Sequence, residues 1–178
     1  MRRKRAEVGM RRIILLRHGE AEPSNPEGDR ARHLTRAGQG AALRLGQELR
    51  AHGLSPDLIL SSDSVRTVET LEGVVRGGGF IGVPVKKLGL LYLAEVDTIL
   101  DRIYEVEDSV RTLLLIGHNP GWSEAATQLS QVPVGLDTAQ AAWLEKKLIV
   151  KEDSRDVESS WTDLLNSQGV WRLRGILP

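Results

Sequence analysis

Hydrophobic residues along this chain alternate between short, nearly unbroken runs and spaced helical patterns. The unbroken runs, which are typical of buried strands, lie at 13–16, 57–61, 83–88 and 112–116. Apolar residues three or four apart predict helices at 35–53, 68–79, 96–103 and 119–129. Thr35 and Asn119 stand where the N-caps of the first and last of these helices are expected. Strand and helix in alternation predict an α/β fold, with a largely parallel sheet covered by helices on both faces.

After Pro133 the pattern changes. Strands are expected at 139–150 and 170–176, where tryptophan and leucine alternate with arginines in the second run. The charged stretch 151–160 between them is expected to be a solvated loop. No internal repeat or linker divides the chain, so we expect one domain over 11–178.

Composition excludes several kinds of site. A chain of 178 residues with 40% hydrophobic and 27% charged residues is typical of one soluble globular domain. It has no cysteine, which rules out disulfides, thiolate chemistry and cysteine-based metal sites. Its four histidines leave little room for a histidine-rich metal cluster. No run approaches the roughly 18–20 apolar residues of a membrane span, and no secretory signal is evident, so a cytoplasmic protein is expected.

The net charge of zero conceals a basic N-terminal segment. Residues 1–12 hold six basic residues and one acid, so the rest of the chain has 18 basic and 23 acidic residues. A basic arm can bind nucleic acid or anionic lipid. A disordered arm over 1–10, or a start at Met10 itself, is the favoured interpretation, and we expect neither a nucleic-acid nor a membrane partner.

Polar groups follow three of the predicted strands at the point where each strand ends. Arg17 and His18 follow the first strand in "LLRHGE", Arg66 lies in "SSDSVRTVET" after the second, and His118 lies in "GHNP" after the strand at 112–116. Ligands of such sheets bind beyond the carboxyl ends of the strands, so these side chains are expected along one edge. Two arginines and two histidines there, beside a helix N-terminus, favour a phosphoryl group as the ligand.

One of the histidines can serve as the nucleophile. A neutral imidazole can accept a phosphoryl group and pass it to water through a covalent phosphohistidine. Phosphoryl transfer depends mainly on positioning and charge neutralisation, which the arginines and the second histidine can supply without metal. His18 is the candidate, because it lies between Arg17 and Gly19 at a strand end.

These motifs, in this order and spacing, resemble the histidine phosphatase (phosphoglycerate mutase-like) superfamily, and within it the short SixA-type phosphohistidine phosphatases. The resemblance spans roughly 11–178 and includes "HLTRAG" and the terminal "WRLRGILP". It implies a three-layer α/β/α sandwich, His18 as nucleophile, and Arg17, Arg66 and His118 as phosphate-binding and transition-state residues. It also implies that no metal or organic cofactor takes part, and that the partner is a phosphorylated protein, for example a histidine phosphotransfer protein involved in signal transduction.

The general acid is left open by the sequence. Larger members of the superfamily carry an acidic residue after the third strand, where Glu95 and Asp97 stand in this chain, and Glu20 is a further candidate. An acid matters most for a poor leaving group such as an alkoxide, so its absence would be consistent with phosphohistidine as substrate. His33 and His52 are expected on the surface, although the loop that holds His33 can border the pocket.

Two other functions compete with a protein phosphohistidine phosphatase. The first is a small-molecule phosphomonoesterase of the same superfamily, which the absence of a long insertion over the pocket disfavours. The second is a phosphate-binding module without turnover, which the complete set of candidate residues disfavours, because binding alone requires no nucleophile.

Overall fold

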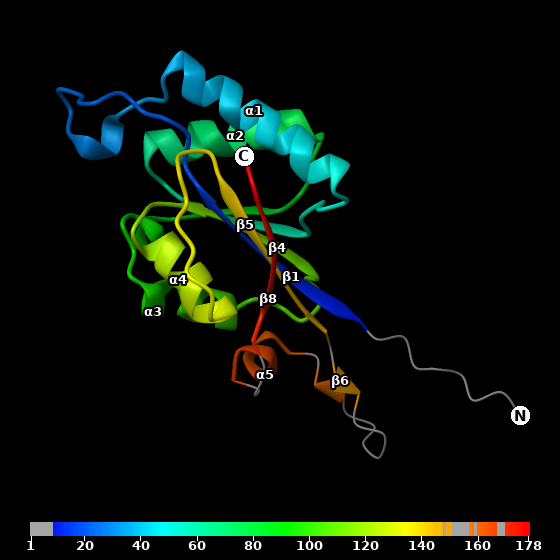
Figure 1. Ribbon diagram of the computed structural model, residues 1–178. Coiled ribbons are helices and arrows are strands. Elements are labelled where there is room, and N and C mark those ends of the chain that lie inside the picture. Colours follow the sequence, from blue (N-terminus) through cyan, green and yellow to red (C-terminus); the bar gives the residue numbers. More distant parts are fainter. Residues whose placement is uncertain (1–8, 148, 151–156, 159, 167–169) are drawn as a thin grey trace, which may run out of the picture.

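The structure is a computed structural model that describes residues 9–147, 149–150, 157–158, 160–166 and 170–178. Its centre is a six-stranded sheet in the order β3-β2-β4-β1-β5-β8 (Figure 1). The strands are β1 (Met10–Arg17), β2 (Leu58–Ser62), β3 (Val85–Leu88), β4 (Thr112–Gly117), β5 (Ala141–Lys147) and β8 (Arg172–Leu177). The first four are mutually parallel, whereas β5 and β8 are antiparallel to their neighbours. The expected α/β class and the mostly parallel sheet are therefore confirmed.

Helices cover both faces of this sheet, as Figure 1 shows. One face carries α1 (Arg36–Ala51) and α2 (Val65–Gly78), and the other carries α3 (Val96–Tyr104) and α4 (Gly121–Ser130), with α5 (Trp161–Asn166) at its end. Alternate residues of β1 feed the two cores: Ile14 and Leu16 pack with the α1 and α2 side, and Ile13 and Leu15 with the other. No helix within the described ranges is long and apolar enough to cross a bilayer.

Glycines let α1 and α2 pack closely against each other. A Cβ added at Gly77 would lie 2.0 Å from the carbonyl oxygen of Leu43, and one at Gly46 would lie 2.3 Å from that of Val74. The first turn of α2 holds Arg66, so this close contact fixes the helix that carries a candidate site residue.

Element boundaries differ from the sequence expectations in several places. β1 begins at Met10 rather than at Ile13, and β3 is limited to Val85–Leu88. The N-cap of α4 is Pro120 rather than Asn119, and the helix begins at Gly121. Thr35 caps α1 as expected, because its hydroxyl oxygen accepts a hydrogen bond from the backbone N–H of Gly38 at 3.0 Å.

Short elements were not predicted. These are the 3₁₀ helices η1 (Asp29–Ala31) and η2 (Gly89–Leu91), the helix α5 and the strand β7 (Val157–Glu158), whereas its partner β6 (Ile149–Val150) lies within the strand expected at 139–150. Val157–Glu158 is paired where a solvated loop was expected, and the rest of 151–160 apart from Ser160 lies outside the described residues. A segment of three to six residues is too short to show a hydrophobic period, so only its packing reveals it. Residues 1–8 of the predicted arm also lie outside the described residues.

Candidate active site

The register of two adjacent strands brings the two candidate histidines together. Arg17 at the end of β1 pairs with Gly117 at the end of β4, so His18 and His118 are the next residues on neighbouring parallel strands. The backbone N–H of His18 donates to the carbonyl oxygen of Gly117 at 3.0 Å, and the two imidazole centroids lie 5.1 Å apart. The separation is close to the usual distance between paired strands. The geometry of the sheet therefore pairs the histidines.

Arg66 reaches the same place from the third neighbouring strand. It is the second residue of α2, which follows β2, and its side chain is buried. Its Nε donates to Nε2 of His18 at 3.3 Å, and its Nη2 donates to Nδ1 of His118 at 3.4 Å. The predicted convergence of these three residues at one sheet edge is what the structure shows.

The hydrogen bonds fix the tautomers of both imidazoles. The Nδ1–H of His18 donates to the carbonyl oxygen of Gly19 at 2.7 Å, which leaves a lone pair on Nε2. In His118 the Nε2–H donates to the hydroxyl of Ser62 at 3.0 Å, which leaves the lone pair on Nδ1. Both lone pairs point at the Arg66 guanidinium, in the space where the three side chains meet.

Burial and neighbouring cations keep both histidines neutral. Burial is the main cause that lowers the pKa of His18 to about 4, and the charges of Arg66 and Arg17 add to it. Burial likewise lowers the pKa of His118 to about 3, with further contributions from His18 and Arg66. An unprotonated Nε2 is the form of His18 that can attack phosphorus.

Arg17 is the last residue of β1 and directly precedes His18. Its Nη1 donates to the carbonyl oxygen of Leu136 at 2.9 Å. Its positive charge contributes to the lowered pKa of His18. Its Nε is buried and has no hydrogen-bond partner within the described part of the chain. A buried donor without a partner is costly, and a phosphoryl oxygen is the kind of acceptor that suits it.

Close contacts hold the chain where it leaves β1. The backbone N–H of Gly19 donates to the hydroxyl of Thr70 on α2 at 3.0 Å. A Cβ added at Gly19 would lie 2.9 Å from the carbonyl oxygen of Gly38 in α1. The glycine that follows His18 thus permits close approach of a helix and ties the histidine to the helix that carries Arg66.

Two residues of this site were not identified from the sequence. Asp29, in the loop after β1, accepts a hydrogen bond from Nη2 of Arg66 at 2.9 Å on its Oδ2. The hydroxyl of Tyr92, which follows η2, donates to the same oxygen at 2.5 Å. The ring of Tyr92 also lies edge-on to His118, with centroids 5.3 Å apart. Nothing in the pattern distinguishes Asp29 from the other acids of its loop, although the expectation that this loop borders the site is confirmed.

The carboxylates considered as general acids lie away from these contacts. Glu95 and Asp97 are exposed in the N-cap and first turn of α3, and within the described residues neither makes a hydrogen bond to the histidines. Glu20 accepts a hydrogen bond from the hydroxyl of Thr35 at 2.7 Å. His33 and His52 are on the surface as expected, beside Glu69 and Glu48 respectively.

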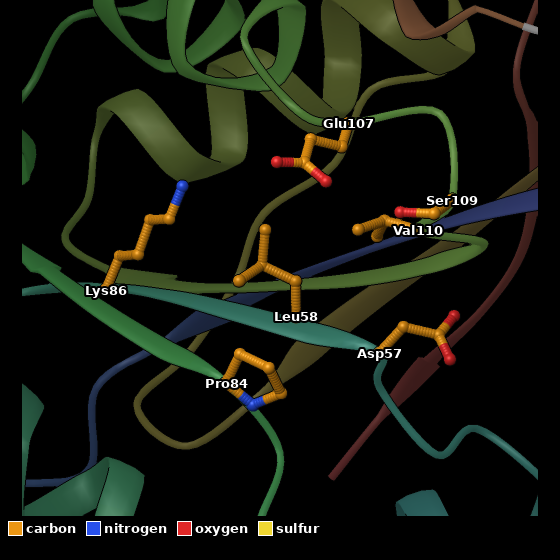
Figure 2. A pocket seen from close by; sticks show the side chains of 7 residues that line it. All are labelled: Asp57, Leu58, Pro84, Lys86, Glu107, Ser109 and Val110. Atoms are coloured by element: carbon orange, nitrogen blue, oxygen red, sulfur yellow. The ribbon is translucent and has the colours of Figure 1, made fainter.

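A separate pocket lies at the opposite, amino-terminal edge of the parallel strands. Figure 2 shows side chains from the start of β2, from the β3 strand and its approach, and from the loop before β4 around a volume of about 320 Å³. Asp57 at its border accepts hydrogen bonds from the backbone N–H groups of Arg111 and Thr112, at 2.9 and 2.8 Å. Among the described residues, no three His, Cys, Asp or Glu side chains come together in a way that could hold a metal ion.

A neutral imidazole lone pair beside a buried guanidinium, at the carboxyl edge of an α/β sheet, is an arrangement suited to holding a phosphoryl group next to a nucleophile. Comparison with known proteins gives the family. The family model of the histidine phosphatase superfamily (branch 1) matches residues 13–91. An uncharacterized chloroplastic protein of Arabidopsis thaliana is 33% identical over 94% of this chain and 77% of its own length.

Solved structures agree with this match along nearly the whole chain. A protein assigned as phosphohistidine phosphatase SixA from Nakamurella multipartitia is 25% identical, with a TM-score of 0.76 over 96% of each chain. Another assigned as SixA from Agrobacterium tumefaciens is 27% identical, with a TM-score of 0.73 over 94% of this chain and 97% of that one. The chain belongs to the histidine phosphatase superfamily and is of the SixA type.

Proposed function

We propose that the protein removes the phosphoryl group from phosphohistidine on a partner protein, through a covalent intermediate on His18. Family membership and the SixA-type structures support phosphatase activity. The observation that carries the proposal is the unprotonated Nε2 of His18, which lies 3.3 Å from Nε of Arg66. A nucleophile and a phosphate-binding cation are thus adjacent before any substrate arrives.

In the first step, Nε2 of His18 attacks phosphorus and forms a P–N bond. The P–N bond of the substrate phosphohistidine breaks, and its electron pair stays on the departing nitrogen. The proton on the other ring nitrogen of the substrate makes the leaving group a neutral imidazole. The phosphoryl oxygens replace the imidazole nitrogens as acceptors of Arg66 and gain the buried Nε of Arg17. The dianion raises the pKa of His118, whose Nδ1 then acquires a proton and donates to a phosphoryl oxygen.

In the second step, water attacks phosphorus of the His18 intermediate. The P–N bond of the enzyme breaks, inorganic phosphate leaves, and the lone pair returns to Nε2. A phosphoryl group on imidazole has a good leaving group, so neither step depends on a carboxylic acid. Both steps rely on positioning and charge neutralisation, the main requirements of phosphoryl transfer.

The surroundings of the site favour a protein substrate. Only η2 and α3 lie between β3 and the residues leading to β4, so no inserted domain closes over the strand ends. Two leucines close to Tyr92 in the sequence are exposed: Leu90 is 65% exposed and Leu93 is 53% exposed. Exposed apolar side chains beside a catalytic site are typical of a surface that contacts another protein.

Activity should be measured on a panel of a phosphohistidine protein, 4-nitrophenyl phosphate and sugar phosphates, with chelator present. We expect the phosphohistidine protein to be turned over fastest, the activated aryl ester next and alkyl esters last. A sugar phosphate that is turned over fastest would instead establish the small-molecule phosphomonoesterase. Binding of phosphate without turnover of any substrate would establish the binding module.

A further inference from the structure

Arg66 uses two different edges of its guanidinium in this structure. The edge formed by Nε and Nη2 faces the imidazole nitrogens of His18 and His118. The edge formed by Nη1 and Nη2 faces Asp29, where Nη1 donates to the backbone carbonyl oxygen at 2.6 Å and Nη2 to the carboxylate at 2.9 Å. Five N–H groups in a fixed plane allow both pairs of contacts at once.

The two edges have different consequences for a bound phosphoryl group. A phosphoryl group attached to Nε2 of His18 lies on the side of the histidines, so it meets the edge formed by Nε and Nη2. Asp29 holds the other edge and does not compete with it. A planar guanidinium anchored along one edge presents the second edge in a fixed orientation.

Asp29 is itself held in place by two groups besides Arg66. Its Oδ2 accepts from the hydroxyl of Tyr92 at 2.5 Å, and its Oδ1 lies 3.0 Å from Nε of Arg32. Tyr92 in turn is covered by the guanidinium of Arg30, whose Cζ lies 4.4 Å from the ring centroid. The Asp29 side chain is half-exposed, whereas Arg66 is buried, so the carboxylate lies on the solvent side of the guanidinium.

The charge state of Asp29 excludes one alternative role. The hydrogen bond from Tyr92 is the main cause that lowers the pKa of Asp29, and Arg66 lowers it further. The carboxyl group is therefore ionised at neutral pH, as an anchor for a guanidinium must be. An ionised carboxylate has no proton to give to a leaving group.

We propose that Asp29, oriented by Tyr92, is a positioning residue that fixes the Arg66 guanidinium so that its Nε and Nη2 edge meets the transferring phosphoryl group. The proposal rests on a phosphatase reaction at His18 but does not depend on which phosphorylated molecule is the substrate. It assigns a function to the loop after β1, which the family resemblance did not single out. Asp29 acts only through Arg66, and this makes the proposal testable.

The test compares Asp29→Ala, Arg66→Ala and the double variant, with 4-nitrophenyl phosphate as substrate. We expect Asp29→Ala to lower kcat about 10- to 100-fold, the cost of a misplaced catalytic group, with KM changed much less. In the Arg66→Ala background, Asp29→Ala should change kcat by less than about twofold, because no guanidinium remains to be positioned. Asp29→Asn, which keeps an acceptor oxygen, should recover part of the loss, and Tyr92→Phe should have a smaller effect that is absent in Asp29→Ala.

A matched control is Glu145→Ala. Glu145 also lies between two arginines, 2.9 Å from Nε of Arg12 and 3.2 Å from Nε of Arg174, but at the other end of β1. Its removal should leave kcat unchanged. Thermal unfolding of each variant separates misfolding from mispositioning. If Asp29→Ala is folded and keeps wild-type kcat, or loses as much kcat in the Arg66→Ala background as alone, the positioning role is wrong.

Vanadate binding separates this proposal from the proposed function. Calorimetric titration with vanadate, which mimics the five-coordinate phosphorus, requires no turnover. Asp29→Ala should weaken vanadate binding about 10-fold or more in the Arg66-containing protein and leave it unchanged without Arg66. A wild-type protein that binds vanadate in this way but hydrolyses no phosphorylated compound would refute the proposed function alone. A wild-type affinity in Asp29→Ala would refute the positioning role alone.

Discussion

The two ends of the parallel strands carry polar residues that are arranged in opposite ways. At the amino-terminal edge, the carboxylate of Asp57 accepts two backbone hydrogen bonds and borders a pocket of about 320 Å³ (Figure 2). At the carboxyl edge, His18, Arg66 and His118 are buried, and the Nε2 lone pair of His18 accepts a hydrogen bond from Nε of Arg66. The Asp57 carboxylate at this pocket is satisfied by backbone groups of the fold, whereas the cluster at the carboxyl edge keeps reactive groups available.

This contrast shows which physical property identifies the site. A carboxylate that binds the N–H groups of a following strand stabilises the loop and has few acceptors left for a ligand. Buried imidazoles kept neutral by neighbouring cations cost stability, and a fold retains them where they serve a function. The chemistry of the side chains therefore locates function here, and each experiment below tests one end of the parallel strands.

The largest effect is expected from the nucleophile. His18→Ala should lower turnover by at least about 10³-fold, because no other group can form the covalent intermediate. Rapid quenching with labelled substrate should trap a phosphoenzyme that is labile in acid and stable in base, and that is missing in the variant. A trapped label on another residue would contradict the assignment.

The next effect concerns the groups that neutralise charge. Arg66→Ala and His118→Ala should each slow turnover by about 10²–10³-fold, as the loss of a preorganised donor typically does. Folding should be much less affected, which urea denaturation of each variant can check. Near wild-type turnover in either variant would mean that its side chain does not face the phosphoryl group.

The depressed pKa values predict how the free protein responds to acid. Burial lowers the pKa of His18 to about 4 and that of His118 to about 3, against the ordinary value of 6.5 in the unfolded chain. Below pH 6.5 the unfolded chain binds protons that the native state does not, so the free energy of unfolding is at its full value above this pH and falls as the pH decreases toward 4.

Nuclear magnetic resonance titration of the imidazole ring protons measures these pKa values directly, and urea denaturation at each pH measures the stability. Titration of His18 near pH 6.5 in the folded protein would show that its Nε2 is not protected from protonation in the way the structure indicates.

The sequence predicts the site residues that lie at strand ends but not those that lie in irregular segments. His18, Arg66 and His118 were found because each immediately follows a strand or lies in the first turn after one, and parallel strands end at a common edge. Asp29 and Tyr92 reach the site from irregular segments, whose path depends on tertiary contacts such as the Asp29–Arg66 ion pair. A hydrophobic period places strands and helices, but it carries no information on the course of a loop.

A smaller effect, on stability alone, is expected at the opposite edge. Asp57→Ala removes the acceptor for the N–H groups of Arg111 and Thr112 and should lower the free energy of unfolding by about 1–3 kcal/mol. Turnover per folded molecule should stay at the wild-type value, because Asp57 lies at the other end of β2 from Arg66. A loss of turnover without a loss of stability would mean that the pocket in Figure 2 takes part in function.

The smallest effect is expected for Glu95→Gln, and it tests whether the carboxyl edge needs an acid at all. Glu95 is exposed at the N-cap of α3, so the substitution should change turnover of phosphohistidine protein and of 4-nitrophenyl phosphate by less than about twofold. Imidazole and nitrophenolate leave readily, whereas an alkoxide requires a proton from a positioned acid.

Alkyl phosphate esters provide the second half of this test. They should be hydrolysed slowly by the wild-type protein and equally slowly by Glu95→Gln. If the wild-type protein instead hydrolyses a sugar phosphate rapidly and the variant loses that activity severely, Glu95 must move to the histidines in the substrate complex. The proposed preference for phosphohistidine would then be wrong. Attack by His18 beside Arg66 would still stand, because that step depends on these two side chains and not on Glu95.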